Sequence, residues 1–92
     1  MQNPPKHPPH SIEAEMSVLG GMMLDNRAGQ DVLDRLAEAD FYTGAHRMIF
    51  RAITALISSN QPCDFITLSE YLRHNNQLEE AGGISYLGSL AN

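Results

Sequence analysis

The sequence predicts an all-α fold, a compact bundle of about five to six helices around a central helix near residues 44–59. Apolar residues recur at helical spacing in several segments, and Gly, Pro, Asn and Ser signals separate these segments. No alternating strand pattern of convincing length is present, because the sole candidate, residues 63–67, is short and runs into a helix-start signal.

Composition limits the chain to one small domain. It has 92 residues, of which 42% are hydrophobic, and a net charge of −5, which disfavours a stand-alone nucleic-acid binder. Cys63 is the only cysteine, which suits a reducing cytoplasm, and no apolar run reaches the roughly 18 residues of a membrane span. Four prolines predict a flexible tail at residues 1–10, with a helical domain at residues 11–92.

The first helix is expected to begin after Ser11, an N-cap residue, and to run to about Leu24. Its apolar stripe contains Ile12, Met16, Leu19 and Met23. The pair Gly20-Gly21 weakens the helix, which suggests either the close approach of another helix or a kink. The methionines at positions 16, 22 and 23 either line an adaptable groove for a partner or, in the favoured interpretation, fill the core.

The second helix is expected at about Ala28–Ala37, after a capping signal at Asp25-Asn26. The central helix then follows Thr43, whose hydroxyl is expected to accept from an amide of the first turn. Asn60 is suited to the left-handed turn that closes this helix, and the proline that follows cannot continue it.

Two further helices are expected towards the C-terminus. A capping box at Thr67 and Glu70 predicts a helix from Ile66 or Thr67 to Asn75. Residues 77–81 are expected to form one or two helical turns, and a last helix starts at Ser85 after a glycine pair. This helix lacks a stop signal, which suggests that the chain is a fragment of a longer protein.

The predicted core collects the apolar faces of these helices. Its members are Leu19, Ile49, Phe50, Ile53, Leu56, Ile57, Leu68, Leu72 and Leu87.

The sequence offers no catalytic residues, no cofactor-binding motif and no metal-ligand cluster. His46, in the first turn of the central helix, is expected to be structural and to bond a carboxylate such as that of Asp40, or the helix cap. Arg47 and Arg51 lie one turn apart on the polar side of that helix. They form either an anion clamp or, in the favoured interpretation, a solvated face that pairs with the acidic segment 31–40.

Five segments together resemble one family, the N-terminal domain of the bacterial replicative DNA helicase DnaB. They are SIEAEMSVLGG at 11–21, DFY at 40–42, HRMIFRAI at 46–53, PCDFITLSEYL at 62–72 and GGISYL at 82–87. The resemblance covers roughly residues 8–92 and implies a helical head without catalytic residues. The helical hairpin and the ATPase domain of the family, which uses ATP and Mg²⁺ and acts on DNA, are absent from this sequence.

The resemblance also implies partners. In the family the head domains form a collar that helps to assemble the hexamer, and they take part in recruiting primase; a helicase loader is a further candidate. The candidate partner surface in this sequence comprises Arg47, Arg51, Tyr86 and Leu90. The alternative is a small helical nucleic-acid-binding module that uses Arg47, Arg51 and Arg73, although single-strand binders need a basic groove with stacking aromatics.

Overall fold

The computed structural model describes residues 11–92, so the predicted proline-rich tail at residues 1–10 lies outside the described residues. Within that range it confirms the all-α prediction, with five α-helices and one short 3-10 helix in place of any strand. In order they are α1 (Ile12–Leu24), α2 (Asn26–Leu33), η1 (Glu38–Asp40), α3 (Gly44–Ser58), α4 (Phe65–His74) and α5 (Gly83–Leu90). None of these helices combines the length and the apolar character needed to cross a bilayer.

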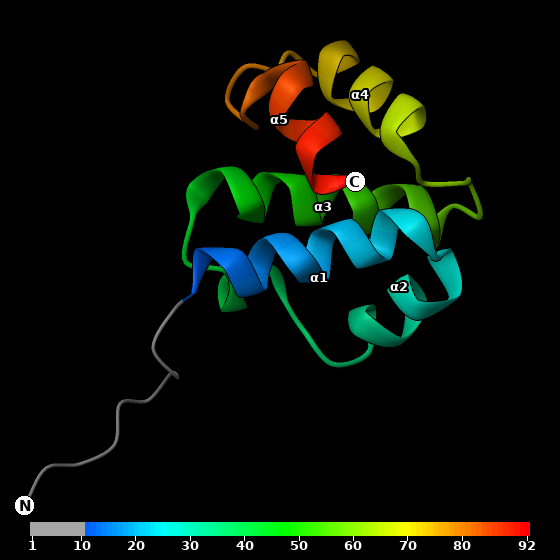
Figure 1. Cartoon of the computed structure of the whole chain (residues 1–92). Coiled ribbons are helices and arrows are strands. Elements are labelled where there is room, and N and C mark those ends of the chain that lie inside the picture. The colour runs from blue at the N-terminus through cyan, green and yellow to red at the C-terminus, as the bar shows by residue number, and fades with distance from the viewer. Residues whose placement is uncertain (1–10) are drawn as a thin grey trace, which may run out of the picture.

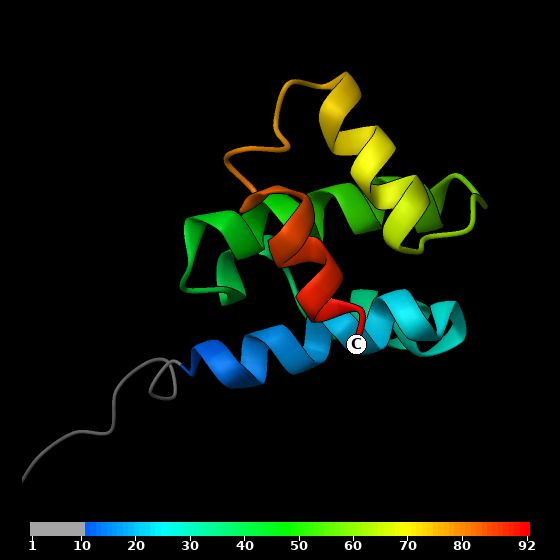
Figure 2. The same cartoon turned by 45° about the horizontal axis from the view of Figure 1, so that its top comes forward.

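Helix α3 lies in the middle of the bundle. Figure 1 shows it between α1 and α2 on one side and α4 on the other, and α3 contacts all three. Helix α5 contacts both α4 and α1, and Figure 2 shows its C-terminal end beside α1. The nine residues that the sequence assigned to the core are all buried, and the largest share of them comes from α3: Leu19, Ile49, Phe50, Ile53, Leu56, Ile57, Leu68, Leu72 and Leu87.

The start of α1 agrees with its sequence signal, whereas the start of α3 does not. The Ser11 hydroxyl accepts from the Ala14 amide at 3.1 Å. Thr43 does occupy the N-cap position of α3, but its side chain makes no capping hydrogen bond and its buried hydroxyl has no partner. The predicted capping hydrogen bond of Thr43 is therefore wrong within the described residues, although Thr43 does occupy the cap position.

Helix α2 begins and ends earlier than the predicted Ala28–Ala37. It begins at Asn26 because the Asp25 carboxylate accepts from the amides of Arg27 and Ala28, at 3.0 and 3.3 Å. It ends at Leu33, and the Ala37 amide instead donates to the Asp40 carboxylate at 2.7 Å. A local side-chain acceptor thus draws the backbone out of the helix.

Helix α4 begins at Phe65, ahead of the predicted start at Ile66 or Thr67. Its cap is Asp64, whose carboxylate accepts from the Thr67 amide while the Thr67 hydroxyl accepts from the Asp64 amide, both at 2.9 Å. Thr67 is thus the third helical residue of the capping box rather than its cap. The helix ends at His74, one residue before the predicted end.

The segment before α5 differs from the sequence prediction as well. Residues 77–81 form hydrogen-bonded turns rather than regular helix. Helix α5 begins at Gly83, two residues before the predicted Ser85, and Gly82 precedes it with a φ of +111°. This left-handed conformation strongly favours glycine, and a side chain here would also meet Tyr86.

The glycine pair in α1 marks a close helix contact. A Cβ at Gly20 would overlap the carbonyl oxygen of Leu90 in α5, whereas a Cβ at Gly21 would meet nothing within 4 Å. Met22 and Met23 are buried and Met16 packs against the core as a half-buried residue, so the methionines fill the core. The close-approach interpretation of the glycine pair is confirmed at Gly20.

We expect Ile53→Ala to lower the free energy of unfolding by roughly 2–5 kcal/mol, because it removes three carbons from a fully buried site at the centre of α3. Urea unfolding of the purified chain measures this loss. The matched control is Ile66→Ala, the same change at a side chain that is 68% exposed, which should cost less than about 0.5 kcal/mol. Equal losses in the two variants would contradict the central position of α3.

We expect Gly20→Ala and Gly21→Ala to change stability in opposite directions. The first introduces a methyl group against the α5 backbone and should destabilise by roughly 1–3 kcal/mol. The second has open space, so the better helix propensity of alanine should add about 0.5–1 kcal/mol. Thermal unfolding of both variants checks the pair, and a stabilised Gly20→Ala protein would disprove the close contact.

Candidate interaction surface

Arg47 and Arg51 both bond to their own chain rather than forming an open clamp. Arg51 donates to both carboxylate oxygens of Glu38, from Nε at 3.0 Å and from Nη2. The hydrogen bond from Arg51 lowers the pKa of Glu38 from its ordinary value. Arg47 donates from Nη1 to the carbonyls of Phe41 and Tyr42, both at 2.8 Å. The interpretation that Arg51 pairs with the acidic segment is therefore confirmed.

Arg73, the third cation of the nucleic-acid hypothesis, also has an internal partner. Its Nη1 lies 2.7 Å from the Glu70 carboxylate, one turn away on α4. All three guanidinium groups of that hypothesis are thus paired or hydrogen-bonded within the chain, on α3 and α4. This arrangement does not provide the unpaired basic groove that single-strand binding requires.

The ring of His46 is fully buried and joins three helices. Its Nδ1 lies 2.7 Å from a carboxylate oxygen of Glu15 in α1, and its Nε2 bonds the hydroxyl of Tyr86 in α5. The expectation of a carboxylate partner is confirmed, but the residue is Glu15 and not Asp40, whose carboxylate binds the Ala37 amide. Glu15 lies 31 residues away in sequence, so local reasoning could not have found it.

The hydrogen bonds define a protonation pattern for this Glu15–His46–Tyr86 network. A neutral His46 satisfies every partner when Nδ1–H donates to Glu15 and Nε2 accepts from the Tyr86 hydroxyl. The other Glu15 oxygen accepts from the Tyr42 amide at 2.7 Å. Each polar group therefore has a partner inside the bundle, and the network holds α1, α3 and α5 together rather than presenting a reactive side chain.

Opposing effects set the pKa of Glu15. Burial raises it, but the hydrogen bonds from the Tyr42 amide, His46 and the Thr43 amide outweigh that effect, so the pKa lies below its ordinary value. Burial, followed by the Glu15 charge, raises the pKa of Tyr86. Both directions favour an ionised Glu15 and a protonated Tyr86 hydroxyl around neutral pH.

Two members of the candidate partner surface are corrected by the structure. Leu90 is only 5% exposed and belongs to the core, where its backbone meets Gly20. Tyr86 is half-buried, with its hydroxyl on His46 and its ring stacked on the imidazole at a centroid distance of 5.8 Å. Because both residues are used inside the bundle, α5 offers less surface to partners through them than the sequence suggested.

Asn26 has a tertiary role that the sequence did not reveal. Its amide group donates to the Cys63 carbonyl and accepts from the Cys63 amide, both at 2.9 Å. This pair of bonds fixes the α1–α2 corner to the segment before α4. Burial, followed by the neighbouring Asp64 charge, raises the pKa of the Cys63 thiol to about 12, so the thiol is protonated and unreactive at neutral pH.

Large apolar side chains remain on the surface at several helix ends. Ile12 of the predicted α1 stripe is 50% exposed, so its assignment to the buried face is wrong. It lies in the first turn of α1, where few elements cover it. The other exposed large apolar residues are Leu24, Tyr42, Ile66 and Ile84.

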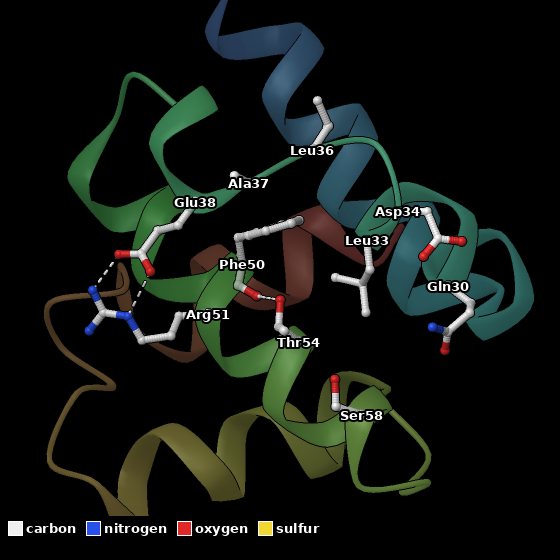
Figure 3. Close-up of a pocket in the computed structure, with 10 residues that line it drawn as sticks. All are labelled: Gln30, Leu33, Asp34, Leu36, Ala37, Glu38, Phe50, Arg51, Thr54 and Ser58. Carbon is white, nitrogen blue, oxygen red and sulfur yellow. Dashed lines mark hydrogen bonds and ion pairs between the residues drawn. The ribbon is translucent and has the colours of Figure 1, made fainter.

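A groove of about 440 Å³ runs between α3 and the segment that links α2 to η1. Figure 3 shows the Glu38–Arg51 pair at one end and Asp34 with Gln30 at the other. The lining residues are Gln30, Leu33, Asp34, Leu36, Ala37, Glu38, Phe50, Arg51, Thr54 and Ser58. The groove exists because α2 ends at Leu33 instead of continuing to Ala37.

Comparison with known proteins agrees with the resemblance. The family model described as DnaB-like helicase N terminal domain matches residues 7–92. The replicative DNA helicase DnaB of Buchnera aphidicola (subsp. Schizaphis graminum) is 46% identical over 86 residues, or 94% of this chain and 18% of that protein. The Haemophilus influenzae DnaB helicase is 45% identical over 85 residues, or 92% of this chain and 18% of that protein.

A solved structure is similar as well. The crystal structure of the N-terminal domain of DnaB helicase from Mycobacterium tuberculosis gives a TM-score of 0.86 at 41% sequence identity. The match covers 92% of this chain and 59% of that chain. The present chain spans under one fifth of the length of the curated relatives described above.

We expect stability to decline as the pH falls below 4.5, the ordinary value of a glutamate, with part of this decline due to Glu15. A carboxyl whose pKa is lowered by folding contributes its full stabilisation above the ordinary value and loses it as the pH falls through the lowered value. Glu15→Gln should therefore show a shallower acid decline in urea unfolding. Glu13→Gln, an exposed acid in the same turn of α1, should follow the unmodified protein, and parallel curves for all three proteins would contradict the assignment.

Proposed function

Because this chain belongs to the family of DnaB-like helicase N-terminal domains, we propose that it is the non-catalytic head domain of a replicative DNA helicase. The match to the family model over residues 7–92 carries the proposal. The internal use of polar side chains supports it. The buried His46 holds helices together, Arg51 pairs with Glu38, and the Cys63 thiol is buried and protonated.

The enzymatic activity belongs to a longer protein in this proposal. That protein would unwind duplex DNA at the replication fork with ATP and Mg²⁺, in the cytoplasm, through a motor domain outside the present sequence. The relatives called replicative DNA helicase, of which this chain spans 18%, support this assignment. The head domain itself would bind neither nucleotide nor metal.

The head domain would act through its surfaces. It would help to assemble the collar of the hexamer and to recruit primase, with a helicase loader as a further partner. The groove beside α3, which is partly lined by half-buried apolar side chains, supports a role in protein contacts.

A nucleic-acid-binding role for the head is the second candidate. The paired arginines and the net charge of −5 weigh against it, because strand binding depends on unpaired cations and releases counterions. Arg27 and Arg35 are exposed, but they lie within an acidic part of the chain. The interaction-domain proposal therefore fits the distribution of charge better.

We expect the chain, extended through its helical hairpin, to bind the C-terminal region of the cognate primase and to gain a higher oligomeric state. Isothermal titration calorimetry measures the binding, and sedimentation velocity measures the assembly. Single-stranded DNA is the control ligand and should show no salt-dependent binding at micromolar concentration. Absence of both primase binding and oligomer formation would count against the proposal, and salt-dependent DNA binding would favour the alternative.

A further inference from the structure

The groove beside α3 has the length of a short helical contact. Arg51, Thr54 and Ser58 line it from α3 at positions i, i+3 and i+7, so this wall spans about 10 Å at 1.5 Å per residue. The opposite wall is formed by Leu33, Asp34, Leu36, Ala37 and Glu38. Two turns of a partner helix have the same length, and such helices commonly insert apolar residues at i, i+3 or i+4, and i+7.

The floor of the groove is apolar. Leu33 and Leu36 are half-buried against the core, and Phe50, which also lines the groove, is buried and packs on Phe41 with ring centroids 4.9 Å apart. The Thr54 hydroxyl donates to the Phe50 carbonyl at 2.8 Å, so it is already used. A partner therefore gains most from side chains that exclude water from this floor.

The backbone of the linking segment has no spare donor for an extended partner. The amides of Arg35 and Leu36 donate to the Val32 carbonyl at 2.9 and 2.8 Å. The Asp34 amide donates to Gln30, and the Ala37 amide donates to the Asp40 carboxylate. Because strand addition needs unpaired edge donors, a helix that satisfies its own backbone fits this groove better.

The charges at one end of the groove neutralise each other in an ion pair, whereas the other end carries negative charge. Glu38 and Arg51 pair at the first end. At the second end, Asp34 is exposed and has no ion pair in the described part of the chain, and both α2 and α3 end with no basic residue in the last turn. Helix C-termini carry partial negative charge, so two of them beside a carboxylate favour a cation. Arg27 and Arg35 do not line the groove.

From this geometry we propose that the α2–α3 groove binds an amphipathic helix of a partner protein, which places apolar residues on Leu33 and Leu36 and a lysine or arginine beside Asp34. The inference rests on the proposed role as an interaction domain and names the chemistry of one partner. Charge complementarity selects a basic helix over an acidic one, because an anion at this end would face the carboxylate and both helix termini.

The test uses two synthetic helical peptides of about 18 residues, long enough to form helix. Both carry the same leucine stripe, with lysines on the polar face of one and glutamates on the other. Titration into the ¹⁵N-labelled chain should move the amide signals of Leu33, Thr54 and Ser58 with the lysine peptide, at a dissociation constant below about 1 mM. The glutamate peptide should bind at least about threefold more weakly.

Charge reversal at the groove provides the matched pair of variants. Asp34→Lys should lower the affinity for the lysine peptide about threefold or more and raise the affinity for the glutamate peptide. Glu79→Lys makes the same charge change in the turn between α4 and α5, outside the groove lining, and at about 0.15 M salt it should alter affinity by less than about 1.5-fold. Both positions are exposed, so neither variant should unfold the chain.

Three results would overturn the proposal. Equal affinity for the two peptides would remove the charge selection, and signal changes away from the groove would place the contact elsewhere. Groove signals that move with protein concentration alone would assign the groove to a second copy of the chain. The outcome is separable from the proposed function, since each of these three results leaves primase binding by the extended chain as an independent test of the interaction-domain role.

Discussion

The burial of α3 along nearly its full length is the constraint on which the other elements depend. Seven of its fifteen residues are buried, and they point to more than one side of the helix. A single neighbouring helix could not cover them, so α1 and α2 pack on one side and α4 on the other. The short outer helices gain most of their stability from this packing, because isolated helices of eight to thirteen residues are marginal in water.

Polar side chains fix the positions of these outer helices more specifically than apolar contacts do. The Glu15–His46–Tyr86 network ties α1 and α5 to the start of α3, and the Asn26 amide ties the α1–α2 corner to the segment before α4. A buried polar group without a partner costs free energy, so each of these contacts excludes alternative packings of the same apolar faces. The side chains of Glu15, His46 and Tyr86, which would otherwise suggest a catalytic site, are thus used in structural hydrogen bonds.

The groove follows from how one helix ends. The Asp40 carboxylate takes the Ala37 amide, and α2 stops at Leu33. A longer α2 would place a continuous helix along α3, whereas the short one leaves Leu33 and Leu36 as a partly open wall. In the described residues, the domain thereby combines an interior whose buried polar side chains are hydrogen-bonded, apart from the Thr43 hydroxyl, with a partly open apolar strip.

The sequence by itself determined the all-α class, the central helix, the nine buried core positions and the resemblance to the family, since helical periodicity and order of segments are local properties. Only the tertiary structure decided that Glu15 bonds the Tyr42 amide and His46, and that Leu90 lies inside while Ile12 does not. The hydrogen bond from the Ala37 amide to Asp40 is local, since it spans only three residues. The helical spacing of the apolar residues nevertheless favoured a longer α2, so the sequence alone did not predict where the helix ends. Partners of polar side chains depend on which helices meet in space, and no spacing along the chain encodes that.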